Sequence, residues 1–265
     1  MMTIGKRSVK IKTRKGIFGS QYPSFLYEGG FIIAKYLRQY IEKNKKINIL
    51  FTRMNISLFH TYGLSLCEKE KNDFSRFLEL FIQYNSHTNL SAIRRADDII
   101  EKHFIDSLFG RDFLKEKNLK TIIDIGSGGG FPGIPLKIAY PECDMTLLDS
   151  VNKKTKAQKH FCDALGLENI RSIWARAENI NTLPEYKGKY DVALSRATAY
   201  IDTIIKWAVP FVKKNGFILL YKIPSPDEQK EIPKLLKKYH LSQKKSIKYT
   251  LAGQERAIFI FQKKK

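Results

Sequence analysis

The chain has few cysteines and no long apolar run. Only Cys67, Cys143 and Cys162 occur in 265 residues, and no two of them form a C-x-x-C pair. This spacing argues against a disulfide framework and against a thiolate zinc site. No apolar run approaches the roughly 18 residues that span a bilayer, and the basic start at 1–15 is not followed by the apolar segment of a signal peptide. We therefore expect a soluble, cytoplasmic protein that binds neither membrane nor metal.

Acidic residues are also scarce relative to basic ones. The chain carries 26 Asp and Glu against 47 Lys and Arg, which gives a net charge of +21. Lys and Arg gain affinity for phosphates by displacing counterions, so a nucleic acid is the first partner to consider. With 43% apolar and 12% aromatic residues, the chain has enough apolar side chains to bury a core, unlike disordered sequences.

The positive charge is concentrated near the start of the chain. Residues 1–53 hold twelve basic and two acidic residues, a net of +10 out of +21. Two interpretations compete: a basic arm that grips nucleic acid, or upstream sequence that precedes a true start at Met54. We favour the second, because a charge run alone rarely signifies more than a solvated tail. Residues 1–53 are thus expected to be disordered or not part of the native protein.

Helical periodicity marks two segments before residue 119. At 67–85 apolar residues recur at spacings of three and four, as on one face of an amphipathic helix, and a similar pattern runs over 97–114. We interpret residues 54–118 as a small helical cap that precedes a main domain at 119–265.

Strands and helices alternate through the main domain. Strands are expected at 121–125, 144–148, 170–174, 191–194 and 217–221, and helices at 134–139, 152–165, 201–212 and 227–239. Short apolar runs separated by helices are typical of a parallel sheet covered on both faces. Two further segments, 246–250 and 256–262, flank a short glycine-containing loop, as in a hairpin. The predicted fold is therefore α/β: a doubly wound sheet with antiparallel strands at its end.

A glycine-rich loop follows the first expected strand, with the sequence DIGSGGGFPG at 124–133. Glycines there let the backbone approach a ligand closely. The dinucleotide fingerprint G-x-G-x-x-G fails from Gly126, because Phe131 stands where glycine is needed. From Gly128 it matches formally, although Pro132 would distort the turn. An acid followed by alternating glycines instead fits S-adenosylmethionine-dependent methyltransferases, in which a nearby acid meets the amino group of the cofactor.

Asp149 closes the second expected strand, 25 residues after Asp124. A carboxylate at this place can accept two hydrogen bonds from ribose hydroxyls. The alternatives are a tight structural turn for the glycines and an ordinary helix N-cap for Asp149. The loop, the acid and the strand order coincide, so we favour a site for S-adenosylmethionine over these alternatives.

Several separated motifs resemble the RsmG (GidB) family of 16S ribosomal RNA guanine-N7 methyltransferases. They are DIGSGGGFPGIPL at 124–136, LLDS at 147–150, Tyr84-Asn85 with Asn89-Leu90-Ser91, His103-x-x-Asp106-Ser107, Arg176-Ala177-Glu178, Ser195-Arg196-Ala197 and Gly253-x-Glu255-Arg256. The resemblance runs from about Met54 to the C-terminus and implies a Rossmann-like methyltransferase fold. Two positions depart from the family pattern: Tyr84 replaces a tryptophan, and Ile223 replaces the glycine after Lys222.

The resemblance also implies roles for individual residues. Gly126 and Phe131 would contact the cofactor, Ala177 and Glu178 would bracket its adenine, and Arg196 would border the site. Gly128 and Asp149 complete the expected cofactor set, and Arg196 is the one residue for which we expect a catalytic role. Guanine N7 has an in-plane lone pair and no proton, so direct transfer requires placement and electrostatics rather than a general base.

RNA would be held by basic side chains near the strand ends. Lys222 and Arg256 are the principal candidates, and Arg196 ends a strand where ligands bind in such sheets. Arg94 and Arg95 are either solvated charges or phosphate contacts. The same choice applies to the Lys153–Lys154 pair after Asp149.

Single residues elsewhere allow two interpretations as well. Phe131 either stacks on the target base or packs beneath the cofactor. His103 either orients Asp106 or the cap, or is a structural helix histidine.

The expected partner is therefore 16S rRNA or the small ribosomal subunit. Two other functions stay open at this stage: a methyltransferase for a small molecule or protein, and a non-catalytic RNA-binding module. The first would show little salt-dependent affinity for RNA. The second would bind no cofactor.

Overall fold

The structure is a computed structural model, and it describes residues 54–264. The predictions for residues 1–53 lie outside the described residues. Within the described part, no helix is both long and apolar enough to cross a bilayer.

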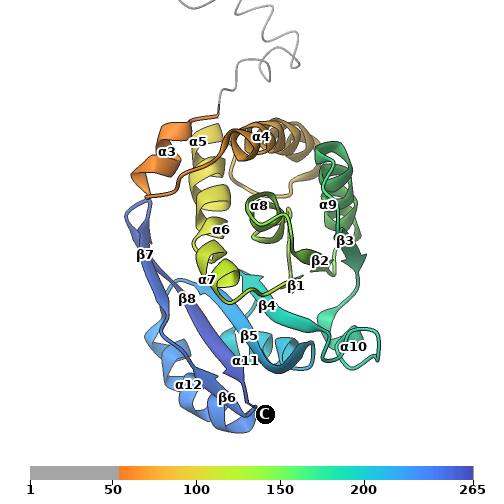
Figure 1. Ribbon diagram of the computed structural model, residues 1–265, viewed down its shortest axis with the longest axis vertical. Coiled ribbons are helices and arrows are strands. Elements are labelled where there is room, and N and C mark those ends of the chain that lie inside the picture. Colours follow the sequence, from red (N-terminus) through yellow and green to blue (C-terminus); the bar gives the residue numbers. More distant parts are fainter. Residues whose placement is uncertain (1–53, 265) are drawn as a thin grey trace, which may run out of the picture. The chain divides into compact units, whose positions relative to one another are not determined.

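A mixed sheet with helices on both faces forms the centre of the described chain (Figure 1). Its strands are β1 (Thr121–Ile125), β2 (Asp144–Asp149), β3 (Ile170–Trp174), β4 (Tyr190–Arg196), β5 (Val212–Lys222), β6 (Leu241–Gln243), β7 (Ile247–Leu251) and β8 (Gln254–Lys263). The order is β3-β2-β1-β4-β5-β8-β6, with β7 also paired to β8. Strands β1 to β5 pair in parallel, and β8 joins β5 antiparallel. The predicted doubly wound α/β fold with antiparallel end strands is confirmed.

The central strands are largely apolar because both faces of the sheet are buried. Ile122 and Leu147 face the core that the cap shares, whereas their chain neighbours Ile123 and Leu148 face the core on the other side. Successive side chains of a strand point to opposite faces, so a strand buried on both sides needs a continuous apolar run. The sequence pattern at 121–125 has this property.

Two helical layers cover the sheet. On one face lie α8 (Gly133–Ala139), α9 (Asn152–Leu165) and the cap; on the other lie α10 (Ala177–Ile180), α11 (Ile201–Ala208) and α12 (Pro226–Lys238). The right-handed crossovers of parallel strands distribute helices over both faces in this way. The carboxyl ends of β1, β2 and β4 consequently lie side by side at one edge.

The cap is more divided than its sequence pattern indicates. It contains α3 (Ile56–Thr61), α4 (Glu68–Thr88), α5 (Ala96–Ile99), a π-helical segment η1 (Ile100–Ile105), α6 (Asp106–Leu108) and α7 (Arg111–Glu116). The prediction of one helix over 97–114 is therefore wrong in detail. Gly110 separates α6 from α7, and a Cβ on it would lie 2.3 Å from the Tyr221 hydroxyl. The backbone at Gly110 therefore lies close to β5, where a residue with a side chain would not fit.

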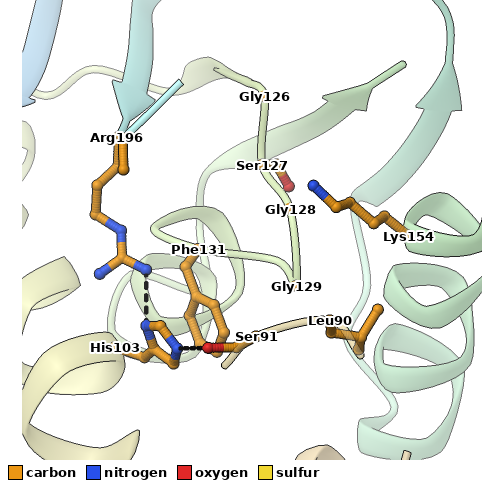
Figure 2. A pocket seen from close by; sticks show the side chains of 11 residues that line it. Leu90, Ser91, His103, Gly126, Ser127, Gly128, Gly129, Phe131, Lys154 and Arg196 are labelled. Atoms are coloured by element: carbon orange, nitrogen blue, oxygen red, sulfur yellow. Dashed lines mark hydrogen bonds between the residues drawn. The ribbon is translucent and has the colours of Figure 1, made fainter. Parts of the chain in front are cut away.

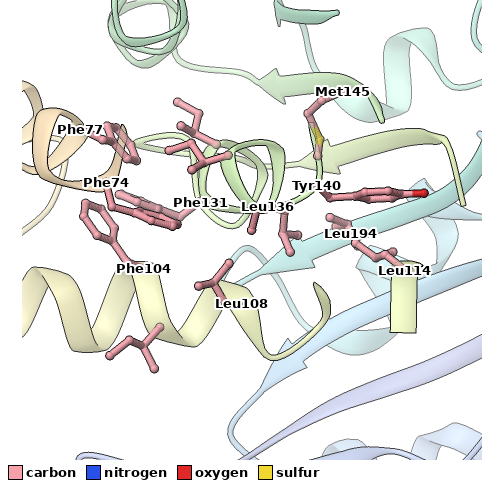
Figure 3. Packing of buried hydrophobic residues seen from close by; sticks show 14 of the residues in the cluster. Phe74, Phe77, Phe104, Leu108, Leu114, Phe131, Leu136, Tyr140, Met145 and Leu194 are labelled. Carbon is pink, nitrogen blue, oxygen red and sulfur yellow. The ribbon is translucent and has the colours of Figure 1, made fainter. Parts of the chain in front are cut away.

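Aromatic side chains join the cap to the glycine loop in one core (Figure 3). Phe77 of α4 stacks on Phe104 of η1 with ring centroids 5.1 Å apart, and it lies 5.6 Å from Phe131 of the loop. The cap thus packs directly on the segment for which the sequence predicts a cofactor site. The division at residue 118 stays an interpretation.

Other boundaries also differ from the prediction. The helix expected over 201–212 ends at Ala208, and Val212 already belongs to β5. Pro210 explains the early end, because it has no N–H to continue the helix. The short elements α3, α10 and β6 were not predicted, and β6 makes the antiparallel end of the sheet three strands rather than two.

Candidate functional site

The loop after β1 folds back sharply over the end of the sheet. The backbone N–H groups of Gly126 and Ser127 both donate to the Leu148 carbonyl, at 2.8 and 3.1 Å. Gly126, Gly128 and Gly130 have φ angles of 72°, 59° and 96°. These left-handed conformations are strained for any residue with a Cβ, so the repeated glycines are required by the backbone path.

Gly126 and Gly128 differ in what surrounds them. A Cβ on Gly126 would lie 2.3 Å from Cγ2 of Thr198, so that glycine allows close packing inside the protein. A Cβ on Gly128 would meet nothing nearer than the Gly126 carbonyl oxygen at 3.9 Å. The backbone at Gly128 therefore faces open space that a ligand can approach.

That space is a cavity of about 160 Å³ between the loop, the cap and the end of β4 (Figure 2). Its lining residues are Leu90, Ser91, His103, Gly126, Ser127, Gly128, Gly129, Phe131, Lys154, Arg196 and Ala197. Four predicted site residues are brought together here: Gly126, Gly128, Phe131 and Arg196. Lys154, left open between helix surface and phosphate contact, also lines this cavity.

Asp149 does not line the cavity but braces its wall. Its side chain is buried, Oδ2 accepts a hydrogen bond from the Gly128 N–H at 2.8 Å, and Oδ1 accepts one from the Val151 N–H at 2.9 Å. The N-cap of α9 is Val151, so the alternative of an ordinary N-cap at Asp149 is wrong. Each carboxylate oxygen has a second lone pair, which leaves acceptors for hydroxyl groups.

Asp124 lies beneath the loop rather than in the cavity. It is fully buried, and its Oδ2 accepts a hydrogen bond from the Gly133 N–H at 2.9 Å. Burial raises the pKa of this carboxyl group to about 7. The acid of the glycine motif therefore anchors the start of α8, and in this structure it is not placed to meet a ligand amino group.

Ala177 and Glu178 begin α10, beyond the end of β3. The Ala175 N–H donates to the Asp149 carbonyl at 3.2 Å, which places the start of α10 beside the end of β2. Ala177 is buried, whereas the Glu178 side chain is exposed and lies 3.8 Å from Arg176. Their contact with a cofactor stays a prediction.

Arg196 is the most constrained charged residue of the site. Its Nη1 donates to the Lys102 carbonyl and to Asp106 Oδ2, both at 2.8 Å, and its Nη2 lies 3.1 Å from His103 Nδ1. The guanidinium carbon lies 5.4 Å from the centre of the Phe131 ring. Strand β4 thus delivers one arginine to the cavity wall, and the cap holds it there.

His103 is neutral in this setting. Burial, with the neighbouring Arg196 charge, lowers its pKa to about 3. An arginine can only donate, so Nδ1 of His103 accepts, and Nε2–H is left to donate to the Ser91 hydroxyl at 2.9 Å. The His-x-x-Asp spacing was the only sequence signal for this residue. The structure shows that His103 contacts Arg196 rather than Asp106.

The two predicted RNA-binding residues are engaged in ion pairs. Lys222 Nζ lies 2.7 Å from Glu228 Oε1 and donates to the Ala199 carbonyl, and its side chain is only 14% exposed. Arg256 Nη1 lies 3.3 Å from Asp106 Oδ2. Neither residue lines the cavity, and an RNA contact by either stays a prediction. Among residues 54–264, no group of three or more His, Cys, Asp or Glu side chains could hold a metal ion.

Comparison with known proteins gives a consistent picture. A family model described as "GidB: rRNA small subunit methyltransferase G" matches residues 70–259. The protein named "Ribosomal RNA small subunit methyltransferase G" from Fusobacterium nucleatum is 42% identical over 174 residues, 66% of this chain and 74% of that protein. The protein of the same name from Lactococcus lactis is 34% identical over 220 residues, 79% of this chain and 90% of that protein.

A solved structure supports the fold. A putative O-methyltransferase from Klebsiella pneumoniae aligns with a TM-score of 0.52 at 12% identity, covering 71% of this chain and 90% of that one. At this level of identity the similarity concerns the fold alone.

Proposed function

Because the chain belongs to the GidB family of rRNA small subunit methyltransferases, we propose that it transfers a methyl group from S-adenosylmethionine to N7 of a guanine in 16S rRNA. The family is one of S-adenosylmethionine-dependent enzymes. One observation carries the proposal: the cavity in which the open backbone of Gly128, braced by Asp149, faces Arg196. A ribosomal substrate assigns the protein to the cytoplasm.

The residues present fit this cofactor. The loop offers backbone without a Cβ at Gly128, and Asp149 keeps free lone pairs for ribose hydroxyls beside it. Ala177 and Glu178 would contact the adenine from the start of α10. The cofactor supplies an electrophilic methyl group on a sulfonium. The side chains and backbone of the protein have only to position the cofactor and the target guanine relative to each other.

No general base is needed for this transfer. The N7 lone pair of guanine attacks directly, and the side chains have to hold it in line at about 3–3.5 Å from the methyl carbon. His103 has no proton to release at Nδ1 and donates through Nε2 to Ser91, so its role is to fix the cavity wall. We assign Arg196, which lines the cavity, the role of placing its charge and its remaining N–H donors beside the reactants.

Lys154 is the basic side chain best placed for the RNA backbone. It lines the cavity near Ser127 (Figure 2), and it forms no salt bridge within residues 54–264. Lys222 and Arg256 would have to leave Glu228 and Asp106 before binding a phosphate. We therefore propose that Lys154 makes the first phosphate contact. Lys222 and Arg256 would contact RNA only after their ion pairs with Glu228 and Asp106 have opened.

The test is a map of methylated guanines in the small-subunit RNA. Deleting the gene should remove one N7-methylguanosine, and re-expression of the wild-type protein, but not of Gly126→Asp, should restore it. An unchanged map would overturn the proposal. If the purified protein binds cofactor while the map is unchanged, the substrate is a small molecule or protein. If it binds RNA but no cofactor, it is an RNA-binding module.

Arg196→Ala tests the predicted catalytic residue. Turnover should fall while the far-ultraviolet circular dichroism spectrum is retained, since Arg196 ends β4 and its side chain is not part of the sheet ladder. Arg111→Ala is the matched control, because among residues 54–264 that arginine forms its ion pair only with the neighbouring Asp112, and it does not line the cavity. Equal turnover in both variants would remove Arg196 from the site.

A further inference from the structure

Asp106 is a fully buried carboxylate that faces three different parts of the fold. It lies at the start of α6, directly after the π-helical segment η1, a type of helix that often occurs at functional sites. Its Oδ2 accepts from Arg196 of β4 at 2.8 Å and from Arg256 of β8 at 3.3 Å. Its Oδ1 accepts from the Tyr249 hydroxyl of β7 at 2.7 Å.

These contacts fix how Arg196 stands in the cavity. A guanidinium has five N–H donors in a rigid plane. In Arg196, two Nη1 hydrogens bind the Lys102 carbonyl and Asp106, and one Nη2 hydrogen binds His103. The Nε–H and one Nη2 hydrogen have no partner among the described residues, and they are the donors left for a reactant.

Charge balance makes Asp106 necessary for this arrangement. Arg196 and Arg256 share one carboxylate oxygen, so two guanidinium groups stand close together in a buried region. His103 is neutral, so it neither adds a third positive charge nor balances the two arginines. Without the Asp106 carboxylate, the two cations would repel each other with little screening, and Arg196 would turn away from Phe131 and the cavity.

Tyr249 sets the orientation of that carboxylate. Its ring stacks on Phe109 of the cap with centroids 3.9 Å apart, so its hydroxyl is held toward Oδ1. With Oδ1 occupied, Oδ2 is the oxygen that faces both arginines. A residue of the C-terminal hairpin, 53 positions after Arg196, thereby acts on the cavity through Asp106.

The geometry points to Asp106 as a positioning residue for methyl transfer, which holds the Arg196 guanidinium at the cavity wall while Tyr249 orients its carboxylate. This inference rests on the proposed function, which names the reaction that Arg196 would serve. The contacts of Asp106 themselves do not depend on that function. Asp106 contacts neither reactant and acts through Arg196.

Tyr249→Phe tests the inference with the least disturbance, and Tyr221→Phe is its matched control. Both substitutions delete one hydroxyl that reaches the same cap segment, but the Tyr221 hydroxyl donates to the Ser107 carbonyl at 2.9 Å and forms no hydrogen bond with Asp106 or Arg196. With the small ribosomal subunit and saturating cofactor, Tyr249→Phe should lower kcat about tenfold. Its KM for RNA should stay within about twofold of wild type, and Tyr221→Phe should change neither constant by more than that.

A second measurement does not depend on the substrate. Nuclear magnetic relaxation of the Arg196 Nε–H group should show larger amplitude motion in Tyr249→Phe than in wild type, and no change in Tyr221→Phe. Asp106→Asn, where it folds, should increase this motion further.

The outcomes separate the two claims. The positioning role would be overturned if both tyrosine variants kept the wild-type kcat, or if both lost the same factor in kcat. An unchanged relaxation signal of the Arg196 Nε–H group in Tyr249→Phe would also overturn it. A wild-type protein that transfers no methyl group to RNA would instead overturn the proposed function, and the relaxation measurement would still decide the role of Asp106.

Discussion

Gly128→Ala separates the two reasons for a glycine in the loop after β1. The added Cβ would meet nothing nearer than the Gly126 carbonyl oxygen at 3.9 Å, so no steric clash within the protein is expected. The φ angle of 59° is unfavourable for alanine, which should destabilise the fold by about 1 kcal/mol. For a domain of this size that corresponds to a fall in Tm of about 2–4 °C.

Gly166→Ala is the control for this backbone strain. Gly166 is the C-cap of α9, has a φ angle of 64°, and would bring its Cβ within 4 Å of nothing. Its stability loss should therefore match that of Gly128→Ala. The two variants differ only in where the new methyl group points, because Gly128 lines the cavity and Gly166 does not.

Cofactor binding should distinguish the two variants. A methyl group in a closely packed contact costs about 1–3 kcal/mol, so the affinity of Gly128→Ala for S-adenosylhomocysteine should fall about 30-fold, equivalent to about 2 kcal/mol. Isothermal titration calorimetry measures the affinity, and differential scanning calorimetry measures Tm. If Gly128→Ala binds within twofold of wild type, or if Gly166→Ala loses as much affinity, the glycine loop is not the surface that the cofactor approaches.

Three further outcomes are expected. As the pH rises from 5 to 7, the raised pKa of buried Asp124 should lower the free energy of unfolding by about 2 kcal/mol, because the folded state holds a proton that the unfolded state has lost. Over the same range the depressed pKa of His103 should raise the free energy of unfolding by about the same amount, because only the unfolded state is protonated. Urea unfolding should thus give a nearly flat wild-type curve, a falling curve for His103→Gln and a rising one for Asp124→Asn, and three parallel curves would contradict both assignments. Lys222→Met should lower the free energy of unfolding in urea by about 3 kcal/mol, since it leaves Glu228 buried without its cation. The double variant Lys222→Met with Glu228→Gln should recover part of that loss. If Lys222→Met were as stable as wild type, the ion pair would not be formed. Asp149→Asn should weaken cofactor binding at least tenfold by calorimetry, because one of the two accepting oxygens becomes an NH2 donor that would face the N–H of Gly128 or Val151 and offer no lone pair to a ribose hydroxyl. Unchanged affinity would remove this carboxylate from the ribose site.

Local patterns predicted the parts of the fold that local physics determines. Strand β1 and helix α9 have the predicted bounds, because a continuous apolar run and a helical repeat each reflect burial along one stretch of chain. The glycine loop could be predicted for a similar reason, since its left-handed φ angles restrict the residue type directly.

Contacts between distant segments could not be predicted from such patterns. The Asp106–Tyr249 hydrogen bond joins residues 143 positions apart, and nothing in either local sequence specifies the other. Helix α10 has four residues, too few to show a helical period. The spacing of apolar residues over 97–114 does not distinguish the π-helical segment η1 from α-helix, so it could indicate only one continuous helix.

The position of Phe131 shows why the cap matters for the cavity. Two roles were open for this side chain, stacking on the target base or packing beneath the cofactor, but the residue is only 5% exposed. One side lies against Phe77 and Phe81 of α4, and His103 stacks on it with centroids 4.5 Å apart. Phe131 has little surface left for an unstacked base, and its ring centre lies 5.4 Å from the Arg196 guanidinium carbon, whereas its contact with the cofactor stays a prediction. The cap supplies the aromatic rings around Phe131, and the cavity wall therefore depends on the cap as much as on the sheet.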